Sequence, residues 1–188
     1  MNLNTNEWKE FCLNDLFSIE AGVYHYSTEY DDGNTPYVSA SNTNNGVAQK
    51  IDLIPDFKGN CITTGKVGCT AFYQPIDFCA TSDVNVFYPK NFKLNEKIGL
   101  FIVSVINVSE NYKWSYGRQC RVGDSKEIII KLPICRDINN NPIIDDTHKF
   151  SPDGYVPDFE FMENYIKSIN HKPITTSNMG GNHHLFLE

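Results

Sequence analysis

Apolar residues recur along the chain in short runs, and two of these runs have the character of a helix. Residues 158–169 follow Pro157 and show a three-and-four spacing, which predicts an amphipathic helix with an apolar face of Phe159, Met162, Tyr165, Ile166 and Ile169. Residues 97–106 (KIGLFIVSVI) are almost continuously apolar. Such a run suits a buried helix or a buried strand, and we expect a helix.

The pattern elsewhere is that of β-structure. From residue 51 to residue 90, short β-prone runs alternate with Gly or Pro, which predicts a meander of short strands curled into a partly closed sheet. An extended run at 36–40 stands between turn signals at 32–34 (DGN) and 44–46 (NNG). Residues 126–132 are the clearest strand, closed by Pro133. Residues 7–20 suit a short amphipathic helix or a strand-turn-helix.

These elements predict an α+β fold: a single globular domain of short twisted β-strands with a few helices. The chain has 188 residues, 40% of them hydrophobic, which is enough for one core and too few for two large ones. We expect the domain to occupy residues 1–157 and the helix residues 158–170. Residues 171–188 have no periodicity and are expected to form a flexible tail.

Charge is distributed unevenly. The formal net charge of −7 excludes a protein that coats DNA through overall basic character. Residues 111–136, however, hold six Lys and Arg against two Asp and Glu, whereas acids outnumber bases seven to one in both 1–32 and 137–163. The basic segment also carries Tyr112, Trp114 and Tyr116 beside Gly117. It is equally consistent with a DNA-contacting loop, in which Arg reads guanine and Gln reads adenine, and with a solvated loop whose lysines offset nearby acids.

Two further segments are polar. Residues 34–49 contain no charge and are rich in Ser, Thr and Asn, a composition that serves turns more often than partner contacts. Gly65-Lys66-Val67-Gly68 lacks the full phosphate-loop pattern. A plain hairpin turn is the favoured interpretation there, and the alternative places Lys66 near a backbone phosphate.

Signatures of catalysis and metal binding are missing from the sequence. It has no G-x-S-x-G, H-E-x-x-H or G-x-G-x-x-G motif. None of the six cysteines forms a C-x-x-C pair, so we expect free thiols, no metal site and no cofactor. His25 and His148 are expected to be structural or surface residues. The adjacent acids Asp145 and Asp146 leave open a metal-dependent nuclease, although no matching lysine signature accompanies them.

Membrane and export features are also missing. The longest apolar stretch, residues 100–106, is far too short to span a bilayer. No basic segment followed by an apolar one opens the chain. We therefore expect a cytoplasmic protein without a membrane partner.

The order of short motifs resembles one known family. The motifs are LFSIEAG (16–22), TPYVS (35–39), NNG (44–46), GKVG (65–68), FYQ (72–74), ATSDV (80–84), GLF (99–101), YGRQ (116–119), IKLP (130–133) and PDFEFMENYIK (157–167). Together, over residues 7–169, they resemble the target recognition domain of the DNA specificity (S) subunits of type I restriction-modification systems. Type IIB and type IIG enzymes carry similar domains.

The resemblance implies a non-catalytic protein that reads one half of a bipartite site in double-stranded DNA. Methylation and cleavage would reside in a methyltransferase (modification) subunit and a restriction motor-nuclease subunit. The helix from Asp158 would start a spacer or dimerisation helix whose apolar face packs on a second copy or a second recognition domain. The residues implied to contact DNA are Ser39, Ser41, Asn42, Asn44, Asn45, Lys66, Tyr73, Gln74, Lys113, Tyr116, Arg118, Gln119 and Arg121.

One departure from the family stands out. A complete S subunit has two recognition domains and two spacer helices, whereas this chain has one of each. A half-subunit that dimerises, a truncated product and an excised domain all remain open, and a homodimer predicts an interrupted palindromic target. Two alternative functions also remain: the nuclease, and an acidic decoy that occupies restriction-modification subunits without reading DNA.

Overall fold

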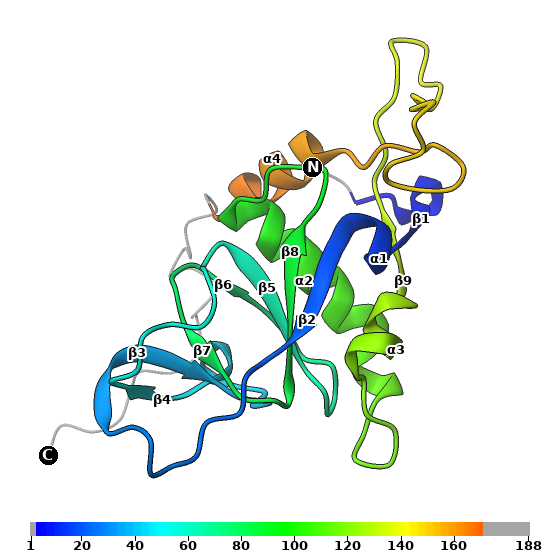
Figure 1. Cartoon of the computed structure of the whole chain (residues 1–188). Coiled ribbons are helices and arrows are strands. Elements are labelled where there is room, and N and C mark those ends of the chain that lie inside the picture. The colour runs from blue at the N-terminus through cyan, green and yellow to red at the C-terminus, as the bar shows by residue number, and fades with distance from the viewer. Residues whose placement is uncertain (1–2, 171–188) are drawn as a thin grey trace, which may run out of the picture.

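A four-stranded antiparallel sheet forms the centre of the computed structural model, which describes residues 3–170 (Figure 1). The strands lie in the order β2 (Phe17–Ala21), β8 (Val84–Pro89), β5 (Cys61–Gly65) and β6 (Ala71–Gln74). Every neighbouring pair is antiparallel. Three of the short strands predicted within residues 51–90 lie in this sheet, in an order that differs from a simple meander. A fourth, Cys79–Ala80, belongs to another sheet, and β2 is added at one edge.

Two smaller sheets flank the central one. In the first, β3 (Asp32–Val38) pairs with β4 (Val47–Ile51) in antiparallel fashion and with β7 (Cys79–Ala80) in parallel fashion. The short 3-10 helix η2 (Asn44–Gly46) lies in the connection between β3 and β4, where the sequence predicts a turn. In the second, β1 (Lys9–Cys12) pairs with β9 (Ile129–Leu132), which confirms the strand expected before Pro133.

At the start of the chain, where the sequence suits a short helix or a strand-turn-helix, the structure has a strand, one helical turn and a second strand. A single helical turn, α1 (Leu13–Leu16), joins β1 directly to β2. An isolated helix of this length is unstable, whereas both flanking segments gain sheet hydrogen bonds and bury Leu13, Leu16 and Phe17 completely. Pairing across the sheets therefore overrides the local amphipathic pattern.

The predicted central helix is confirmed as α2 (Glu96–Glu110), which packs on β6 and on β9. The Asn95 side chain caps it by accepting a hydrogen bond from the Ile98 backbone at 3.0 Å. Its buried face carries Ile98, Phe101, Ile102 and Ile106, spaced three or four positions apart. The remaining short helices are η1 (Thr5–Glu7), η3 (Asn111–Lys113) and α3 (Val122–Lys126).

Helix α4 (Phe159–Asn170) forms where the sequence predicts it, but its apolar face is used inside the domain. Met162 and Ile166 are buried in the same core as α2. Phe159 stacks on Phe92 with ring centroids 4.4 Å apart, and Tyr165 meets Phe101 edge-on at 5.9 Å. Of the residues expected to form a seam for a second chain (Phe159, Met162, Tyr165, Ile166 and Ile169), Met162 and Ile166 are therefore buried within the domain, whereas the other three remain partly exposed. Ile169, near the end of the helix, is the most exposed of the five.

Residues 133–157 form an arm at one end of the domain, part of which projects outward (Figure 1), whereas Ile134 and Phe150 are buried in the core. Three isolated antiparallel bridges hold it together: Ile134 with Pro157, Arg136 with Pro142, and Ile144 with Tyr155. Across residues 3–170, no helix has the length and apolar content needed to cross a membrane. The tail expected at 171–188 lies outside the described residues.

The burial of Met162 yields a test. Met162→Ala should lower the free energy of unfolding by about 2–5 kcal/mol, because it leaves a cavity in the core between α2 and α4. Ile169→Ala on the same helix is the control and should cost less than about 1 kcal/mol, since its side chain is 44% exposed. Urea unfolding measures both. A Met162→Ala loss that depended on protein concentration would instead indicate a face shared between chains.

Candidate nucleic-acid interface

Three polar segments that are far apart in the sequence meet at Thr70. The Thr70 hydroxyl lies 2.7 Å from Asn42 Oδ1 and 3.2 Å from Asn111 Oδ1. Asn42 belongs to the turn between β3 and β4, Thr70 ends the turn between β5 and β6, and Asn111 starts the basic segment after α2. The structure therefore joins the three segments for which the sequence suggests DNA contact.

The asparagine turn has an unusual backbone. Asn44 and Asn45 both have φ of 53°, in the left-handed region that asparagine tolerates better than most residues. The Asn44 side chain closes the turn by donating to the Val47 carbonyl at 2.7 Å. The Asn45 side chain donates to the carbonyl of Tyr73 at 3.0 Å and to Gln74 Oε1 at 3.1 Å. These bonds hold the exposed tip of the turn against β6.

Gln74 supports this turn from within the protein. Its side chain is 3% exposed and donates to the Asn45 carbonyl at 3.0 Å and to Thr63 Oγ1 at 2.9 Å. Tyr73 is also buried, and its hydroxyl donates to Asn60 Oδ1 at 2.8 Å. Neither side chain is available to a DNA base in this structure, so their expected role changes from contact to support.

The basic segment begins at a buried carboxylate. Glu110, 2% exposed, accepts hydrogen bonds from Lys113 Nζ at 2.7 Å and from Trp114 Nε1 at 3.1 Å. The bond to Glu110 raises the pKa of Lys113, which keeps the ammonium protonated and the buried carboxylate paired. The Arg118 guanidinium in turn lies over the Trp114 ring, 4.8 Å from its centroid. Glu110 thus positions Arg118 through Trp114.

Beyond Trp114 the chain forms a tight exposed turn. Ser115 and Arg118 exchange backbone hydrogen bonds of 3.0 and 3.1 Å, with Tyr116 and Gly117 at the tip. Tyr116 is 87% exposed, and the side chains of Arg118 and Arg121 also reach solvent. The turn presents an aromatic ring and two guanidinium groups on one loop, groups that can stack on bases, fork onto guanine and contact phosphate.

The loop is fastened to the sheet behind it. The buried Asn85 of β8 donates to the Cys120 carbonyl at 2.7 Å and to Ser125 Oγ at 3.0 Å. The Cys120 backbone N–H donates to the Lys66 carbonyl at 2.7 Å. The Lys66 ammonium itself donates to the Ser82 carbonyl, which ties it to the protein. In Figure 1, the turn between β5 and β6 and the loop before α3 lie together at the lower end of the domain.

The expected contact residues fall into three classes by exposure. Exposed positions are Asn42, Asn44, Asn45, Lys113, Tyr116, Arg118 and Arg121; Ser39, Ser41, Lys66 and Gln119 are half-buried; Tyr73 and Gln74 are buried. The sequence analysis does not find the supporting residues Glu110, Thr70, Asn107 and Asn111. Asn107, near the end of α2, bonds to the backbone of Ala71 at 2.7 and 3.1 Å, and Asn111 directly follows the helix four positions later. Two asparagines at this spacing on a largely apolar stretch are a usable signal.

The acidic pair suggested for a nuclease has a structural role. Asp145 Oδ1 accepts hydrogen bonds from the backbone and the hydroxyl of Thr147, at 3.0 and 2.7 Å, and these bonds lower its pKa. Its other oxygen lies 3.4 Å from Lys149 Nζ, and Asp146 points to solvent. These contacts are those of a turn-stabilising carboxylate, which opposes the nuclease interpretation.

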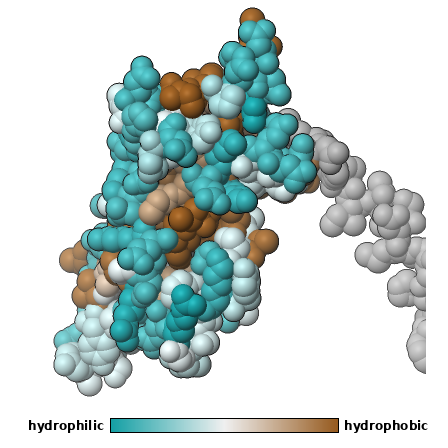
Figure 2. All heavy atoms as spheres, turned by 90° about the vertical axis from the view of Figure 1, so that its right-hand side faces the viewer, coloured by the Kyte–Doolittle hydropathy of each residue, from teal (hydrophilic) through white to brown (hydrophobic). Residues whose placement is uncertain are grey.

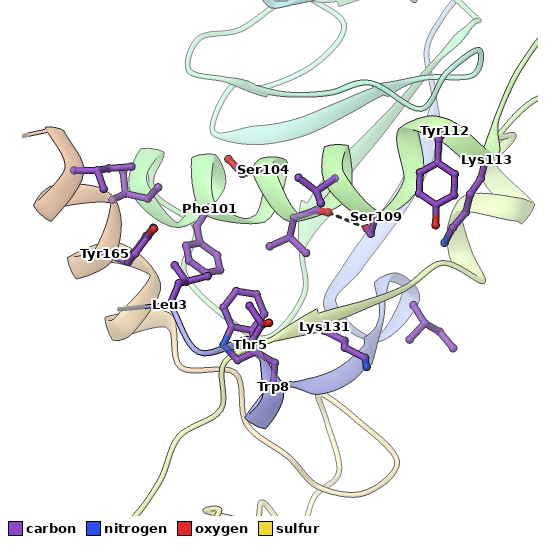
Figure 3. Close-up of a pocket in the computed structure, with 15 residues that line it drawn as sticks. Leu3, Thr5, Trp8, Phe101, Ser104, Ser109, Tyr112, Lys113, Lys131 and Tyr165 are labelled. Atoms are coloured by element: carbon purple, nitrogen blue, oxygen red, sulfur yellow. Dashed lines mark hydrogen bonds between the residues drawn. The ribbon is translucent and has the colours of Figure 1, made fainter. Parts of the chain in front are cut away.

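A separate apolar groove of about 650 Å³ runs along α2 (Figure 3). Trp8 and Phe101 meet in it with ring centroids 5.6 Å apart, α4 contributes Tyr165, and the groove reaches Tyr112 and Lys113 at the start of the basic segment. Figure 2 shows hydrophobic side chains at the surface in the middle of one face, surrounded by hydrophilic ones.

Comparison with known proteins identifies relatives of this arrangement. The family model described as the type I restriction modification DNA specificity domain matches residues 5–147. A curated relative, the specificity subunit S.BcgI of a type II restriction enzyme from Heyndrickxia coagulans, is 28% identical over 176 residues, which is 92% of this chain.

Two solved structures share the fold. The S subunit of a type I restriction-modification system from M. genitalium matches 88% of the chain with a TM-score of 0.60 and 15% identity. The HsdS subunit from Thermoanaerobacter tengcongensis matches 97% with a TM-score of 0.58 and 11% identity. The chain spans 46% of the length of the curated relative, and 38% and 42% of the two structures.

The hydrogen bonds of Gln74 give a testable prediction for this surface. Gln74→Leu removes the side-chain amide that bonds to Asn45 and leaves the Asn45 carbonyl without its partner. The variant should therefore lose about 1–3 kcal/mol of unfolding free energy. Amide hydrogen exchange at residues 44–47 should also become faster. Gln49→Leu, on an exposed position of β4, is the control and should change stability by about 0.5 kcal/mol or less. Equal exchange rates in the two variants would contradict the supporting role.

Proposed function

Because the chain belongs to the type I restriction modification DNA specificity domain family, we propose that it is a target-recognition module that reads one half of a bipartite DNA site. In this function the chain performs no catalysis. It directs a methyltransferase subunit and a restriction motor-nuclease subunit, which modify and cleave the DNA, and it acts in the cytoplasm. Its similarity to a specificity subunit over 92% of its length supports this assignment.

The observation that carries the proposal is the junction at Thr70. Through Asn42 and Asn111 it joins an exposed asparagine turn to the start of an exposed aromatic-basic segment. We assign base reading to Arg118 and Gln119, because Arg forks onto guanine and Gln onto adenine in the major groove. Asn42, Asn44 and Asn45, with Ser39 and Ser41, form the adjacent turn. The Asn44 and Asn45 amide nitrogens and the Asn42 oxygen are bonded within the protein, so we assign DNA contact to the Asn44 and Asn45 oxygens and the Asn42 amide nitrogen.

The remaining residues of the proposed surface have other roles. Tyr116 offers a ring at the tip of the loop, and Arg121 is suited to phosphate contact. Lys113 and Lys66 are bonded to Glu110 and to Ser82, so we assign them mainly to positioning. Tyr73 and Gln74 support the asparagine turn from behind.

The charge balance bears on affinity. Phosphate neutralisation supplies most non-specific DNA binding, and the chain has a formal net charge of −7. We therefore expect weak binding by the chain alone and stronger binding within a complex, whose other subunits contribute phosphate contacts. Binding should also fall steeply with salt.

The chain covers less than half of its curated relative, so the bipartite site requires a second reader. A second copy would place two identical loops about a two-fold axis and specify an interrupted palindrome, whereas a different recognition domain would specify an asymmetric site. Met162 and Ile166 of α4 are buried within the domain, so any pairing through this helix would use its partly exposed residues Tyr165 and Ile169, which line the groove along α2.

The two alternatives are less well supported. The Asp145 side chain is engaged in a turn, and the comparisons connect the chain to specificity subunits. A decoy that does not read DNA would not require the pre-positioned guanidinium of Arg118.

A genome-wide map of modified bases tests the function. Deleting the gene from the organism that encodes it should abolish modification at one interrupted motif, and restoring the gene should bring it back. An unchanged map would oppose the specificity function. A palindromic motif would favour the symmetric pair.

The role of Arg118 is tested by measuring modification of DNA that carries the mapped motif or a single-base variant of it. Arg118→Ala should remove about 1–3 kcal/mol of discrimination at one base position and so broaden the set of modified sites there. Lys149→Ala is the control: it also removes an exposed cation, but on the projecting arm, and it should leave the preference unchanged. An Arg118→Ala protein with unaltered preference and affinity would contradict the assignment.

A further inference from the structure

Three potential metal ligands, none of them among the residues assigned to DNA, meet beside the three-stranded sheet. Ligand atoms of His25, Asp56 and Cys79 all lie within 4.8 Å of one another, and His25 Nε2 is 2.7 Å from Asp56 Oδ2. Within residues 3–170, no other group of three or more His, Cys, Asp or Glu side chains lies close enough together to share an ion. Cys79 is fully buried, whereas the other two side chains remain partly open to solvent.

The backbone holds two of the three ligands in place from neighbouring strands. Phe57 and Phe78 form an isolated antiparallel bridge with two backbone hydrogen bonds of 3.0 Å, which brings the adjacent residues Asp56 and Cys79 together. Cys79 is also registered against Tyr37 in the parallel pairing of β7 with β3. The site is therefore fixed by strand pairing and not by a flexible loop alone.

The third ligand is oriented by its surroundings. The His25 ring lies against Tyr37 with centroids 6.3 Å apart, and Tyr37 is packed by Tyr30 at 5.4 Å. His25 Nδ1 is 3.8 Å from Glu29 Oε2, which itself accepts a hydrogen bond from the Tyr26 backbone. A carboxylate facing the second ring nitrogen is the usual companion of a metal-binding histidine, because it selects the tautomer that leaves Nε2 free.

We propose that His25, Asp56 and Cys79 bind one Zn²⁺ ion, with water completing a tetrahedral site. Imidazole, thiolate and carboxylate together are a donor set that Zn²⁺ accepts, whereas Mg²⁺ and Ca²⁺ require oxygen ligands. On binding, the Cys79 thiol releases its proton to solvent and its sulfur bonds the ion. The ion would fasten the connection between β2 and β3 to β7.

The spacing of these ligands explains why no metal-binding motif is visible in the sequence. The three ligands stand 31 and 23 positions apart and belong to three different segments. Spacing rules detect pairs of ligands within one turn or one knuckle, and this site has none. The expectation that His25 is merely a structural residue and that the chain has no metal site rests on those rules.

The experiment uses the full chain, from which bound metal is first removed with a chelator. Zn²⁺ is then added in the presence of a chromophoric chelator that competes with the protein for the ion. We expect one tightly bound ion per chain and a melting temperature that rises with zinc concentration. Cobalt(II) in place of zinc should give a thiolate-to-metal charge-transfer band. Glu29→Gln should weaken binding by about 10-fold, as expected for a residue that orients a ligand.

Matched variants decide whether the ion occupies this site. His25→Gln and Cys79→Ser should each abolish stoichiometric binding, and Cys79→Ser should also abolish the cobalt band. Cys135→Ser, a half-buried cysteine outside the cluster, should leave both unchanged. The double variant His183→Ala/His184→Ala should do the same, which separates the site from the adjacent histidines near the end of the chain.

The proposal has clear contrary outcomes. Absence of stoichiometric zinc binding by the unaltered chain would overturn it, as would retained binding in His25→Gln or loss of binding in the His183/His184 variant. If Cys79→Ser fails to fold, His25→Gln still decides, because its partly open side chain is replaced without creating a buried cavity. Circular dichroism of the metal-free proteins verifies that each variant is folded.

Discussion

One asparagine side chain fixes the central helix to the edge of the central sheet, and the placement of the proposed reading surface depends on it. Asn107 of α2 accepts a hydrogen bond from the Ala71 backbone N–H at 2.7 Å and donates to the Ala71 carbonyl at 3.1 Å. Ala71 lies on β6, the edge strand, whose outward backbone groups would otherwise lack partners in the protein. The amide satisfies both groups and sets the register of the helix on the strand. One turn further on, Asn111 reaches Thr70, and the basic segment starts from that point.

The basic segment contributes less net charge to this surface than its composition indicates. Lys113 is paired with the buried Glu110, and Arg136 lies 3.4 Å from Glu7 at the other end of the segment. An ion pair between exposed side chains contributes little to stability. A cation bonded to a buried carboxylate stays paired with it, because breaking the pair would leave a buried charge without a partner. Arg118 and Arg121 therefore carry the proposed contacts, and Arg118 is held by stacking on Trp114. A few positioned guanidinium groups suit specificity better than strong non-specific binding.

Local patterns in the sequence predicted the elements better than their partners. The three-and-four spacing of apolar residues predicts α4, the apolar run at 97–106 lies within α2, and Pro133 directly follows β9. Such signals act over a few residues; Pro, for example, lacks the backbone N–H that a strand needs to continue. The same spacing could not tell which surface covers α4, and Met162 packs on α2 instead of a second chain. Likewise, Thr70, Asn42 and Asn111 come from separate segments whose junction only the fold creates. The burial of Gln74 could not be predicted from its sequence neighbours, since exposure depends on tertiary packing.

The proposed zinc site and the proposed reading turn lie on the same small sheet, and β3 connects them. Tyr37 of β3 packs against His25 and pairs with Cys79, and the next turn of the chain begins at Ser39, whose N–H donates to the Gly46 carbonyl at 2.8 Å. This sheet has only a few core residues of its own, with Tyr37, Ile51 and Cys79 in one cluster and Val38 in another. A small core gives little resistance to local opening. An ion that fastens β7 to the connection before β3 would therefore restrain the strand that carries the asparagine turn, and so would couple metal binding to the order of the proposed reading surface.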